Sequence, residues 1–406
     1  RQRQMCIRDM DEEIVRKVVY RDPTEILVAL ESTNAAVFFK SLPPQSVEYA
    51  RLMKEKMRFE HLVAMDEWGS EVAASTLGPG ASGAAVVGLR NRLINLGHMQ
   101  RTFSATYNGE LKNAVRRFQA ASGLLVTGVA GNLTMEQINV PATERLAQIM
   151  VAMERERWLN QDLGDRHVLV NLTDFTAKIM DFGKVTFQTN SVIGAHDDDR
   201  RSPEFSDTME HMIVNPSWYV PRSIITNEYL PMLQMDPNAV DFLELRDDLG
   251  NVVERAGLDF NDFDEETFPF GMRQPPSVGN ALGLVKFMFP NRNNIYLHDT
   301  PAKILFGREV RAFSHGCIRL ENPFEFANAL LAVQSSDPKT QFQDALDFGE
   351  EVQIDLDTHI PVHIIYRTAV TLPGGGLEFR RDIYGRDAKI WEALQLEGVV
   401  LSDFTG

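Results

Sequence analysis

Two short motifs near the end of this chain decide its fold and its chemistry: YLHDT at residues 296–300 and SHGCIRL at residues 314–320. Together they hold a thiol, two imidazoles, a glycine beside the thiol and an arginine just after it. A nucleophilic thiol needs a nearby base to remove its proton, and the oxyanion formed on an attacked carbonyl needs backbone N–H donors. Gly316 lets the backbone approach a substrate closely, because it has no side chain. The two motifs therefore indicate acyl-transfer chemistry at a cysteine.

The bulk composition is that of a folded, acidic protein with more than one domain. A chain of 406 residues predicts two or three domains. Its 44% of hydrophobic and 24% of charged residues are ordinary for a globular fold. The net charge of −16 argues against a nucleic-acid partner, which would require a basic face. No apolar run approaches the roughly 18 residues of a membrane-spanning helix.

The two cysteines, Cys6 and Cys317, are expected to differ in origin. Residues 1–9 have no initiator methionine and read like translated cloning or adaptor sequence, so we expect them to be non-native. On that interpretation a signal peptide or membrane anchor has been lost from the N-terminus, and its absence carries no information. The native part then has one cysteine, Cys317, which favours a thiol kept for chemistry.

The first part of the chain shows helical periodicity and predicts a helical scaffold region over residues 1–75. The Pro-Pro pair at 43–44 breaks this run in the middle. After a Gly-rich linker at 77–83, the pattern predicts a compact unit of short helices within 76–140. A further helix within 141–163 is expected to return the chain to the scaffold region.

The helical unit at 76–140 carries the pattern L…V…FQ…GL…TG…G…T. Its members are Leu111, Val115, Phe118, Gln119, Gly123, Leu124, Thr127, Gly128, Gly131 and Thr134. This pattern resembles the peptidoglycan-binding domain 1 family, which implies a module that contacts the cell wall. A plain three-helix spacer, in which Phe118 and Leu124 serve only as core, is the alternative.

From residue 164 the hydrophobic period changes to two, which predicts β-strands and a catalytic domain over 164–370. Residues 222–275 interrupt the strand pattern, because they are first helical and then acidic and turn-rich. We interpret this interruption as a cap inserted between strands. Residues 371–406 are assigned to a C-terminal extension. The predicted fold class is α+β, with a mainly β domain, a cap and two helical regions.

The two motifs and their spacing resemble the L,D-transpeptidase catalytic domain (YkuD) family. The first histidine precedes the cysteine by nineteen positions, and the second histidine lies two positions before the cysteine. Further matches to its YcbB-like branch are NPSW at 215–218, RQPP at 273–276, NALG at 280–283 and DIYGRD at 382–387. The pair Pro276-Ser277 differs from the Gly-Pro pair that the family pattern has before NALG. The resemblance implies a mixed β sandwich that works without a cofactor.

By this resemblance Cys317 is the nucleophile and His298 is the general base. The backbone carbonyl of Asp299 orients the imidazole, in the role that an acidic side chain has in other triads. The oxyanion donors would be the N–H groups of Gly316 and Cys317, with the Tyr296 hydroxyl as a weaker candidate.

For three side chains around the motifs, the sequence allows two different roles. His315 polarises the thiol or the oxyanion, or it holds its loop by a structural hydrogen bond. Arg319 binds a substrate carboxylate, or it pins its loop through an ion pair. Trp218 walls the substrate groove beside Tyr219, or it packs in the core. The remaining candidates for substrate binding are Ser314, Arg311 and Asn280.

The resemblance implies an enzyme that joins peptidoglycan stem peptides. Cys317 would attack the bond between a third-residue diamino acid, such as diaminopimelate, and the terminal D-Ala. The amine of a second stem would then resolve the thioester and form a 3→3 cross-link, and carbapenems should acylate the same thiol. A periplasmic or cell-envelope location follows, with an inner-membrane anchor in the full-length protein.

Carboxylate-rich stem peptides would suit a local excess of basic residues around the motifs. Its members are Lys286, Arg292, Lys303, Arg308 and Arg311. Each of them alone is more simply explained as a solvated surface charge.

Other functions remain open at this point. L,D-carboxypeptidase, D-amino-acid exchange and lipoprotein-tethering members share the acyl-enzyme, so the motif does not choose among them. A zinc hydrolase with His298, His315 and Cys317 as ligands lacks an acidic base at recognisable spacing, and we expect no metal. A papain-like protease would place its cysteine before its histidine. A non-catalytic wall-binding scaffold is disfavoured by the intact His298 and Cys317.

Overall fold

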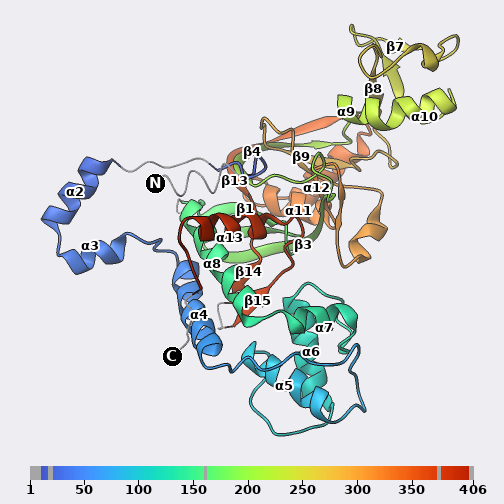
Figure 1. Ribbon diagram of the computed structural model, residues 1–406. Helices are drawn as coiled ribbons and strands as arrows, with labels where there is room; N and C mark the ends of the chain where they lie inside the picture. Colours follow the sequence, from blue (N-terminus) through green and yellow to red (C-terminus); the bar gives the residue numbers. More distant parts are fainter. Residues whose placement is uncertain (1–10, 17–21, 160–161, 373–375, 402–406) are drawn as a thin grey trace.

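The computed structural model describes residues 11–16, 22–159, 162–372 and 376–401. Figure 1 shows a central β domain with a helical unit below it and a small lobe at its upper right. The N-terminal residues that we expect to be non-native, together with Cys6, lie outside the described residues.

The helical part begins with α2 and α3, which extend from the body of the molecule (Figure 1). Its helices are α2 Pro23–Ser32, α3 Ala35–Ser41, α4 Val47–Ala64, α5 Ala84–Asn95, α6 Gly109–Ala121, α7 Asn132–Asn139 and α8 Ala142–Trp158. Ser46 caps α4 by accepting a hydrogen bond from the Tyr49 N–H at 3.1 Å. In the described ranges, no helix is both long enough and apolar enough to cross a membrane.

The helix α8 returns along α4, and the two helices share one hydrophobic core with α5–α7. The strands β14 (Ala369–Thr371) and β15 (Leu377–Phe379) complete this core from the far end of the chain. The rings of Phe59 and Phe379 meet edge to face, with their centroids 5.7 Å apart. The segment predicted as a C-terminal extension therefore helps to build the helical scaffold.

The β domain is a nine-stranded mixed sheet in the order β11-β3-β12-β10-β9-β4-β13-β1-β2. Its strands are β1 Arg166–Asn171, β2 Thr176–Asp181, β3 Lys184–Gly194, β4 Phe205–Val214, β9 Val285–Met288, β10 Leu297–His298, β11 Ala312–Ser314, β12 Ile318–Leu320 and β13 Val352–Ile365. The long strand β3 pairs with β2 through its first part and with β12 and β11 through its last residues. Through these pairings β3 connects the edge strand β11 to the edge strand β2 at the opposite end of the order.

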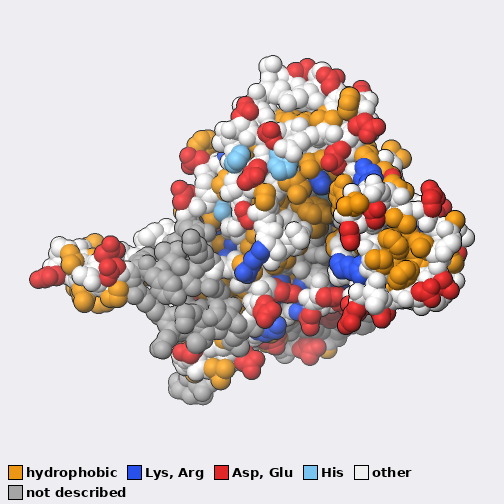
Figure 2. Space-filling model, turned by 90° about the horizontal axis from the view of Figure 1, so that it is seen from above, with side chains coloured by type: hydrophobic (Ala, Val, Ile, Leu, Met, Phe, Trp, Pro, Cys, Tyr) orange, Lys and Arg blue, Asp and Glu red, His pale blue; other side chains and the backbone are white. Residues whose placement is uncertain are grey.

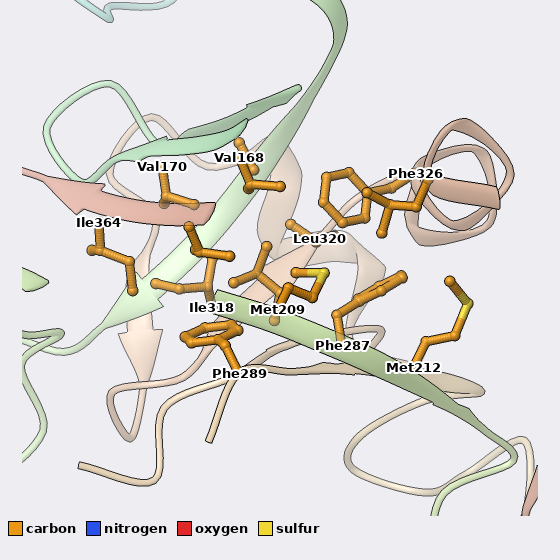
Figure 3. Packing of buried hydrophobic residues seen from close by; sticks show 14 of the residues in the cluster. Val168, Val170, Met209, Met212, Phe287, Phe289, Ile318, Leu320, Phe326 and Ile364 are labelled. Carbon is orange, nitrogen blue, oxygen red and sulfur yellow. The ribbon is translucent and has the colours of Figure 1, made fainter. Parts of the chain in front are cut away.

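Alternating apolar side chains from these strands form the main core, which Figure 3 shows with α11 (Pro323–Leu331) packed against it. The residues labelled there are Val168, Val170, Met209, Met212, Phe287, Phe289, Ile318, Leu320, Phe326 and Ile364. A second helix, α12 (Pro338–Asp347), adds Phe342 to the same cluster. Burial of apolar area on this scale is what stabilises the sheet.

The predicted cap is a separate small lobe with its own core, at the upper right of Figure 1. Within the predicted bounds of 222–275 it contains the helical segments α9 Arg222–Ile224, η1 Ile225–Tyr229, α10 Leu230–Met235 and η2 Phe260–Asp262, and the strands β6 Glu244–Arg246, β7 Val252–Val253 and β8 Gly271–Gln274. The lobe also includes the strand β5 Trp218–Tyr219, which lies just before those bounds. The strands form a sheet in the order β5-β8-β6-β7. Because β5 and β8 pair, the two chain segments that enter and leave the cap lie side by side.

A buried ion cluster joins the scaffold helix α8 to the β domain and to α13 (Arg386–Leu396). Arg155 on α8 contacts both carboxylate oxygens of Glu204 at 2.7 Å and Oδ1 of Asp387 at 2.8 Å. The three side chains are almost completely buried. We expect Arg155→Met to lower the free energy of unfolding by about 3 kcal/mol, because it leaves two carboxylates buried without this partner.

Thermal unfolding followed by circular dichroism measures this effect. Lys56→Met is the matched control, because Lys56 forms a solvent-accessible pair with Glu60 on α4, and such pairs contribute at most about 1 kcal/mol. Equal losses of stability in the two variants would contradict the structural role of the cluster.

Candidate active site

A cavity of about 790 Å³ lies where the cap meets the sheet, and it collects most of the predicted site residues. Those that line it are Trp218, Tyr219, Tyr296, His298, Ser314, His315, Cys317 and Arg319. Figure 2 shows this side of the molecule, with hydrophobic side chains gathered along a hollow between the cap lobe on the right and the remaining body. The sequence motifs, which are separated along the chain, therefore meet in one concave site.

Three adjacent strands form the floor of this cavity and fix the position of His298. On β10, His298 pairs with Lys286 of β9 on one side and with Arg319 of β12 on the other. Side chains alternate between the faces of a strand, and paired residues share a face. The preceding row, Phe287, Leu297 and Ile318, is completely buried in the core on the opposite face. His298 consequently stands between two cationic side chains in the row that lines the cavity.

The His298 ring is held by the backbone, as the sequence predicted. Its Nδ1 lies 2.5 Å from the carbonyl oxygen of Asp299. A carbonyl only accepts, so Nδ1 carries the proton and Nε2 has the lone pair. The Leu282 carbonyl is a second backbone acceptor near the ring. Nε2 is the nitrogen that can act as a base.

Asp299 is itself fixed by its side chain, which keeps its carbonyl in place. Its carboxylate accepts hydrogen bonds from the Leu284 N–H at 2.9 Å and from the Lys303 ammonium at 2.7 Å. Gly283 makes this possible: a Cβ at that position would lie 2.3 Å from the Asp299 carboxylate, and its φ of +63° is in the left-handed region. The base is therefore oriented by a chain of contacts that begins in the loop after the cap.

The thiol and the imidazole are both neutral in the resting site. Burial, reinforced by the positive charge of Arg319, lowers the pKa of His298 to about 3. Burial raises the pKa of Cys317 to about 11, although the Tyr296 hydrogen bond and the Arg319 charge oppose the rise. These two shifts disfavour a preformed thiolate–imidazolium pair.

The loop that carries Cys317 is tied by hydrogen bonds to its own backbone. Ser314 Oγ donates to the Cys317 carbonyl at 2.6 Å, and Gly316 has a φ of +103°. The Gly316 N–H donates to Ser314 Oγ at 3.3 Å, so it is not free to serve the oxyanion as the sequence predicted. The Cys317 N–H has no acceptor among the residues that the structure describes. Cys317 therefore provides the stronger backbone candidate for the oxyanion donor.

Tyr296 is close to both the thiol and the base. Its hydroxyl and the Cys317 thiol affect each other's pKa, while the thiol donates a long hydrogen bond to the Asn294 carbonyl at 3.5 Å. The Tyr296 ring meets the His298 ring with centroids 5.6 Å apart. Burial, with the nearby Cys317 as a second cause, raises the pKa of Tyr296 well above its usual value. The hydroxyl thus stays protonated and can donate a hydrogen bond to developing negative charge.

His315 contacts the cap, which favours the structural one of its two interpretations. Its Nε2 lies 2.6 Å from Oε1 of Glu228, a residue of η1 in the cap. Arg200 reaches the same carboxylate oxygen at 3.1 Å. Glu228 was not predicted as a site residue, because the cap carries no recognised motif and its partners come from distant parts of the chain. The contact connects the cysteine loop to the lobe that covers it.

We expect Glu228→Gln to raise the KM for a stem-peptide substrate about fivefold, with kcat for the same substrate changed less than twofold. The variant removes the charge that joins the cap to His315, and a partly exposed pair of this kind is worth at most about 1 kcal/mol. Steady-state kinetics measures both constants. Glu266→Gln is the control, because Glu266 is an exposed cap residue whose side chain has no described partner. An unchanged KM in Glu228→Gln would contradict a role for this contact.

Arg319 lines the cavity without an acidic partner. Among the described residues it forms no ion pair, and its buried Nε has no hydrogen-bond acceptor. Burial lowers the pKa of the guanidinium, and the neighbouring Cys317 opposes this. The ion pair that the sequence suggested as an alternative is therefore not present, and the guanidinium is available to a substrate anion.

Two predicted substrate-binding residues lie outside the cavity lining. Arg311 donates to the carbonyls of Ser191 and Phe175, both at 3.1 Å, so its guanidinium is used to hold strands together. Asn280 is completely buried, and its amide donates to backbone carbonyls on both sides of the cap. These carbonyls belong to Pro216 at 3.1 Å, Gln274 at 3.2 Å and Pro275 at 3.0 Å. Both residues are thus structural in this geometry.

The two aromatic residues of β5 are used differently. Trp218 is buried in the cap core, where its ring meets Tyr229 edge to face, and it also lines the cavity. Tyr219 lines the cavity and is 66% exposed. Trp218 therefore both packs in the cap core and contributes to the cavity wall. Tyr219 is the more exposed of the two side chains and is accessible to a ligand.

Most of the five basic residues predicted to surround the motifs do not line the cavity. Lys286 alone of the five lines it. Lys303 pairs with Asp299, and Arg311 contacts carbonyls as described above. In the described ranges, no group of three or more His, Cys, Asp or Glu side chains is arranged to hold a metal ion. Of the three ligands that the zinc alternative would use, His315 instead contacts Glu228.

Comparison with known families agrees with this architecture. Residues 165–354 match the model of the L,D-transpeptidase catalytic domain, YkuD. Residues 82–138 match a family described as "Putative peptidoglycan binding domain". Residues 165–354 therefore match an L,D-transpeptidase catalytic (YkuD) domain, and residues 82–138 match a helical domain of peptidoglycan-binding type.

Individual relatives extend this comparison. A protein of Haemophilus influenzae described as "Putative L,D-transpeptidase" is 30% identical over 297 residues, which are 72% of this chain and 58% of that protein. The chain thus spans less than two thirds of this relative's length. The crystal structure of the L,D-transpeptidase of Xylanimonas cellulosilytica is 15% identical with a TM-score of 0.23, covering 72% of this chain and 98% of that one. The L,D-transpeptidase of Stackebrandtia nassauensis is 14% identical with a TM-score of 0.27, covering 71% and 93%.

Proposed function

We propose that this protein is a peptidoglycan L,D-transpeptidase that forms 3→3 cross-links through a thioester on Cys317. One observation supports this most directly. A single cavity brings together a thiol, an imidazole whose free nitrogen is set by a backbone carbonyl, and an arginine without an acidic partner. Nucleophile, base and anion-binding group are the parts that acyl transfer from an anionic peptide requires.

In the acylation step, Cys317 Sγ attacks the carbonyl between the third stem residue and the terminal D-Ala. The thiol proton passes to His298 Nε2, and the oxyanion is stabilised by the Cys317 N–H and the Tyr296 hydroxyl. When the C–N bond breaks, the His298 imidazolium returns the proton to the leaving amine, and D-Ala departs. The products of this step are a thioester and a neutral imidazole.

In the second step, the side-chain amine of another stem's third residue attacks the thioester carbonyl. His298 Nε2 removes a proton from the amine, and as the C–S bond breaks the imidazolium returns this proton to the departing thiolate, which regenerates the Cys317 thiol and the neutral imidazole. A new amide joins the third residues of two stems. Exclusion of water by the cap would favour the amine over hydrolysis.

Arg319 is proposed to bind a carboxylate of the donor stem beside the reacting carbonyl. Tyr219 and Trp218 would form a wall against which the peptide lies, and Ser314 would keep the cysteine loop in shape. The helical domain at 82–138 would hold the enzyme near peptidoglycan strands, in the periplasm or cell envelope. Carbapenems, whose strained carbonyl reacts with the same thiol, are proposed inhibitors.

The test is incubation with a purified disaccharide-tetrapeptide, followed by liquid chromatography and mass spectrometry. We expect release of D-Ala together with a dimer that contains a 3→3 bond. Release of D-Ala without a dimer would indicate an L,D-carboxypeptidase instead, and incorporation of added D-amino acids alone would indicate exchange. No change in the substrate would contradict the proposed function.

A further inference from the structure

Lys286 is a second cation on the floor of the cavity, and the mechanism described above does not use it. It pairs with His298 across β9 and β10, on the side opposite Arg319, and it lines the same cavity. Among the described residues its ammonium has no hydrogen bond or ion pair, in contrast to Lys303, which is paired with Asp299. Burial lowers the pKa of Lys286, and the charge of Glu351 opposes this.

The charges that line the cavity indicate that the Lys286 ammonium binds an anionic group of a ligand. Lys286 and Arg319 are both cationic, and no Asp or Glu is among the cavity-lining residues. Both charges lower the pKa of His298, which stands between them. Glu351, whose charge acts on Lys286, lies outside this lining, and two partly buried cations that face a cavity without an acidic side chain are costly in free energy. A ligand that carries two negative charges would satisfy both.

The sheet geometry places these two cations on opposite sides of the reacting centre. Neighbouring strands are about 4.8 Å apart, so two strand spacings separate Lys286 from Arg319 by about 10 Å at the backbone. Arg319 lies two residues after Cys317 in sequence and its charge acts on the thiol, so we place it closer than Lys286 to the leaving D-Ala. Lys286 is left to face a more distant carboxylate of the donor.

We propose that Lys286 is a specificity-determining residue that binds the side-chain carboxylate of the donor's third residue. The inference rests on the proposed function and makes it more specific. The enzyme would prefer donors with a diaminopimelate-type third residue, which ends in both an amine and a carboxylate. Donors in which this carboxylate is amidated or missing, as in a lysine-type stem, would bind more weakly.

The test uses two synthetic tetrapeptide donors that differ only in whether the third-residue side-chain carboxylate is free or amidated. For the wild-type enzyme we expect kcat/KM to be about tenfold higher with the free carboxylate, mainly through KM. Lys286→Met should reduce this preference to less than twofold, and Lys286→Arg should keep most of it. Lys184→Met is the matched control, since Lys184 is exposed at the β2–β3 turn, and it should retain the full preference.

The outcomes separate this inference from the proposed function. Equal kcat/KM values for both donors in the wild-type enzyme would overturn the role of Lys286 and leave the transpeptidase activity intact. A full preference retained in Lys286→Met would overturn it as well. Loss of turnover of both donors in Lys286→Met, with unchanged thermal stability and unchanged alkylation of Cys317 by neutral iodoacetamide, would assign Lys286 to the reaction itself and not to specificity. Wild-type enzyme that uses neither donor would contradict the proposed function.

Discussion

Cys317→Ala is expected to lower turnover of a tetrapeptide donor by at least about ten-thousandfold. The thiol is the only nucleophile in the cavity lining that the proposed thioester route can use, and removing the nucleophile of a catalytic triad eliminates nearly all of the rate enhancement. The variant should also form no covalent adduct with a carbapenem. Intact-protein mass spectrometry after incubation with the drug measures the adduct directly.

The controls for this experiment come from the chain itself. Cys6→Ser removes the other cysteine and should leave both turnover and adduct formation unchanged. The melting temperature of Cys317→Ala should stay close to that of the wild type, because the side chain is small and only partly buried. An adduct on Cys317→Ala would exclude this thiol as the acylated group. Wild-type protein that forms no adduct even after reduction would contradict a competent nucleophile.

The sequence predicted the fold where local patterns were strong. Strand alternation and the change of period after residue 164 indicated the β domain, and the helical spacing around residues 76–140 indicated the helical unit. The fold class and the family were predicted from the motifs and are confirmed by the matches at 165–354 and 82–138. Both results depend on information within a short window of sequence.

Which strands pair with one another could not be predicted from the sequence. The strand β10 has only two residues, so no period can be read from it, and its parallel partner β12 lies twenty residues later in the same region. The row formed by Lys286, His298 and Arg319 follows from this pairing. Lys286 appeared in the sequence only as one of five basic residues, because nothing local distinguishes a cavity lysine from a surface lysine.

Long-range polar contacts explain the other differences. Arg311 and Asn280 were expected to bind substrate, but their donors are satisfied by backbone carbonyls that are distant in sequence or contributed by a loop. Buried polar groups find partners wherever the fold brings them, and residue type does not reveal which partner is used. Glu228 was missed for the same reason, since its contact with His315 joins residues 87 positions apart.

His298→Ala is expected to lower acylation about a thousandfold at pH 7, with the fold retained. A positioned general base contributes roughly a hundredfold to ten-thousandfold. Without it, only thiol that is already ionised can react, and a pKa of about 11 leaves about one thiol in ten thousand ionised at pH 7. His359→Asn, a change of an exposed histidine on β13, is the control and should keep full activity. The rate of carbapenem acylation measures the effect in each variant.

The pH dependence tests the same assignment more sharply than the loss of rate. In the wild type the reactive form has neutral His298 and protonated Cys317, and with pKa values of about 3 and about 11 this form predominates at every pH between them. We therefore expect a nearly flat acylation rate from pH 5 to pH 9. In His298→Ala the ionised fraction grows tenfold with each pH unit below 11, so its rate should rise about a thousandfold between pH 6 and pH 9 and approach the wild-type rate. A bell-shaped wild-type profile centred near neutral pH would instead indicate a preformed ion pair, and parallel profiles for the two proteins would exclude His298 as the base.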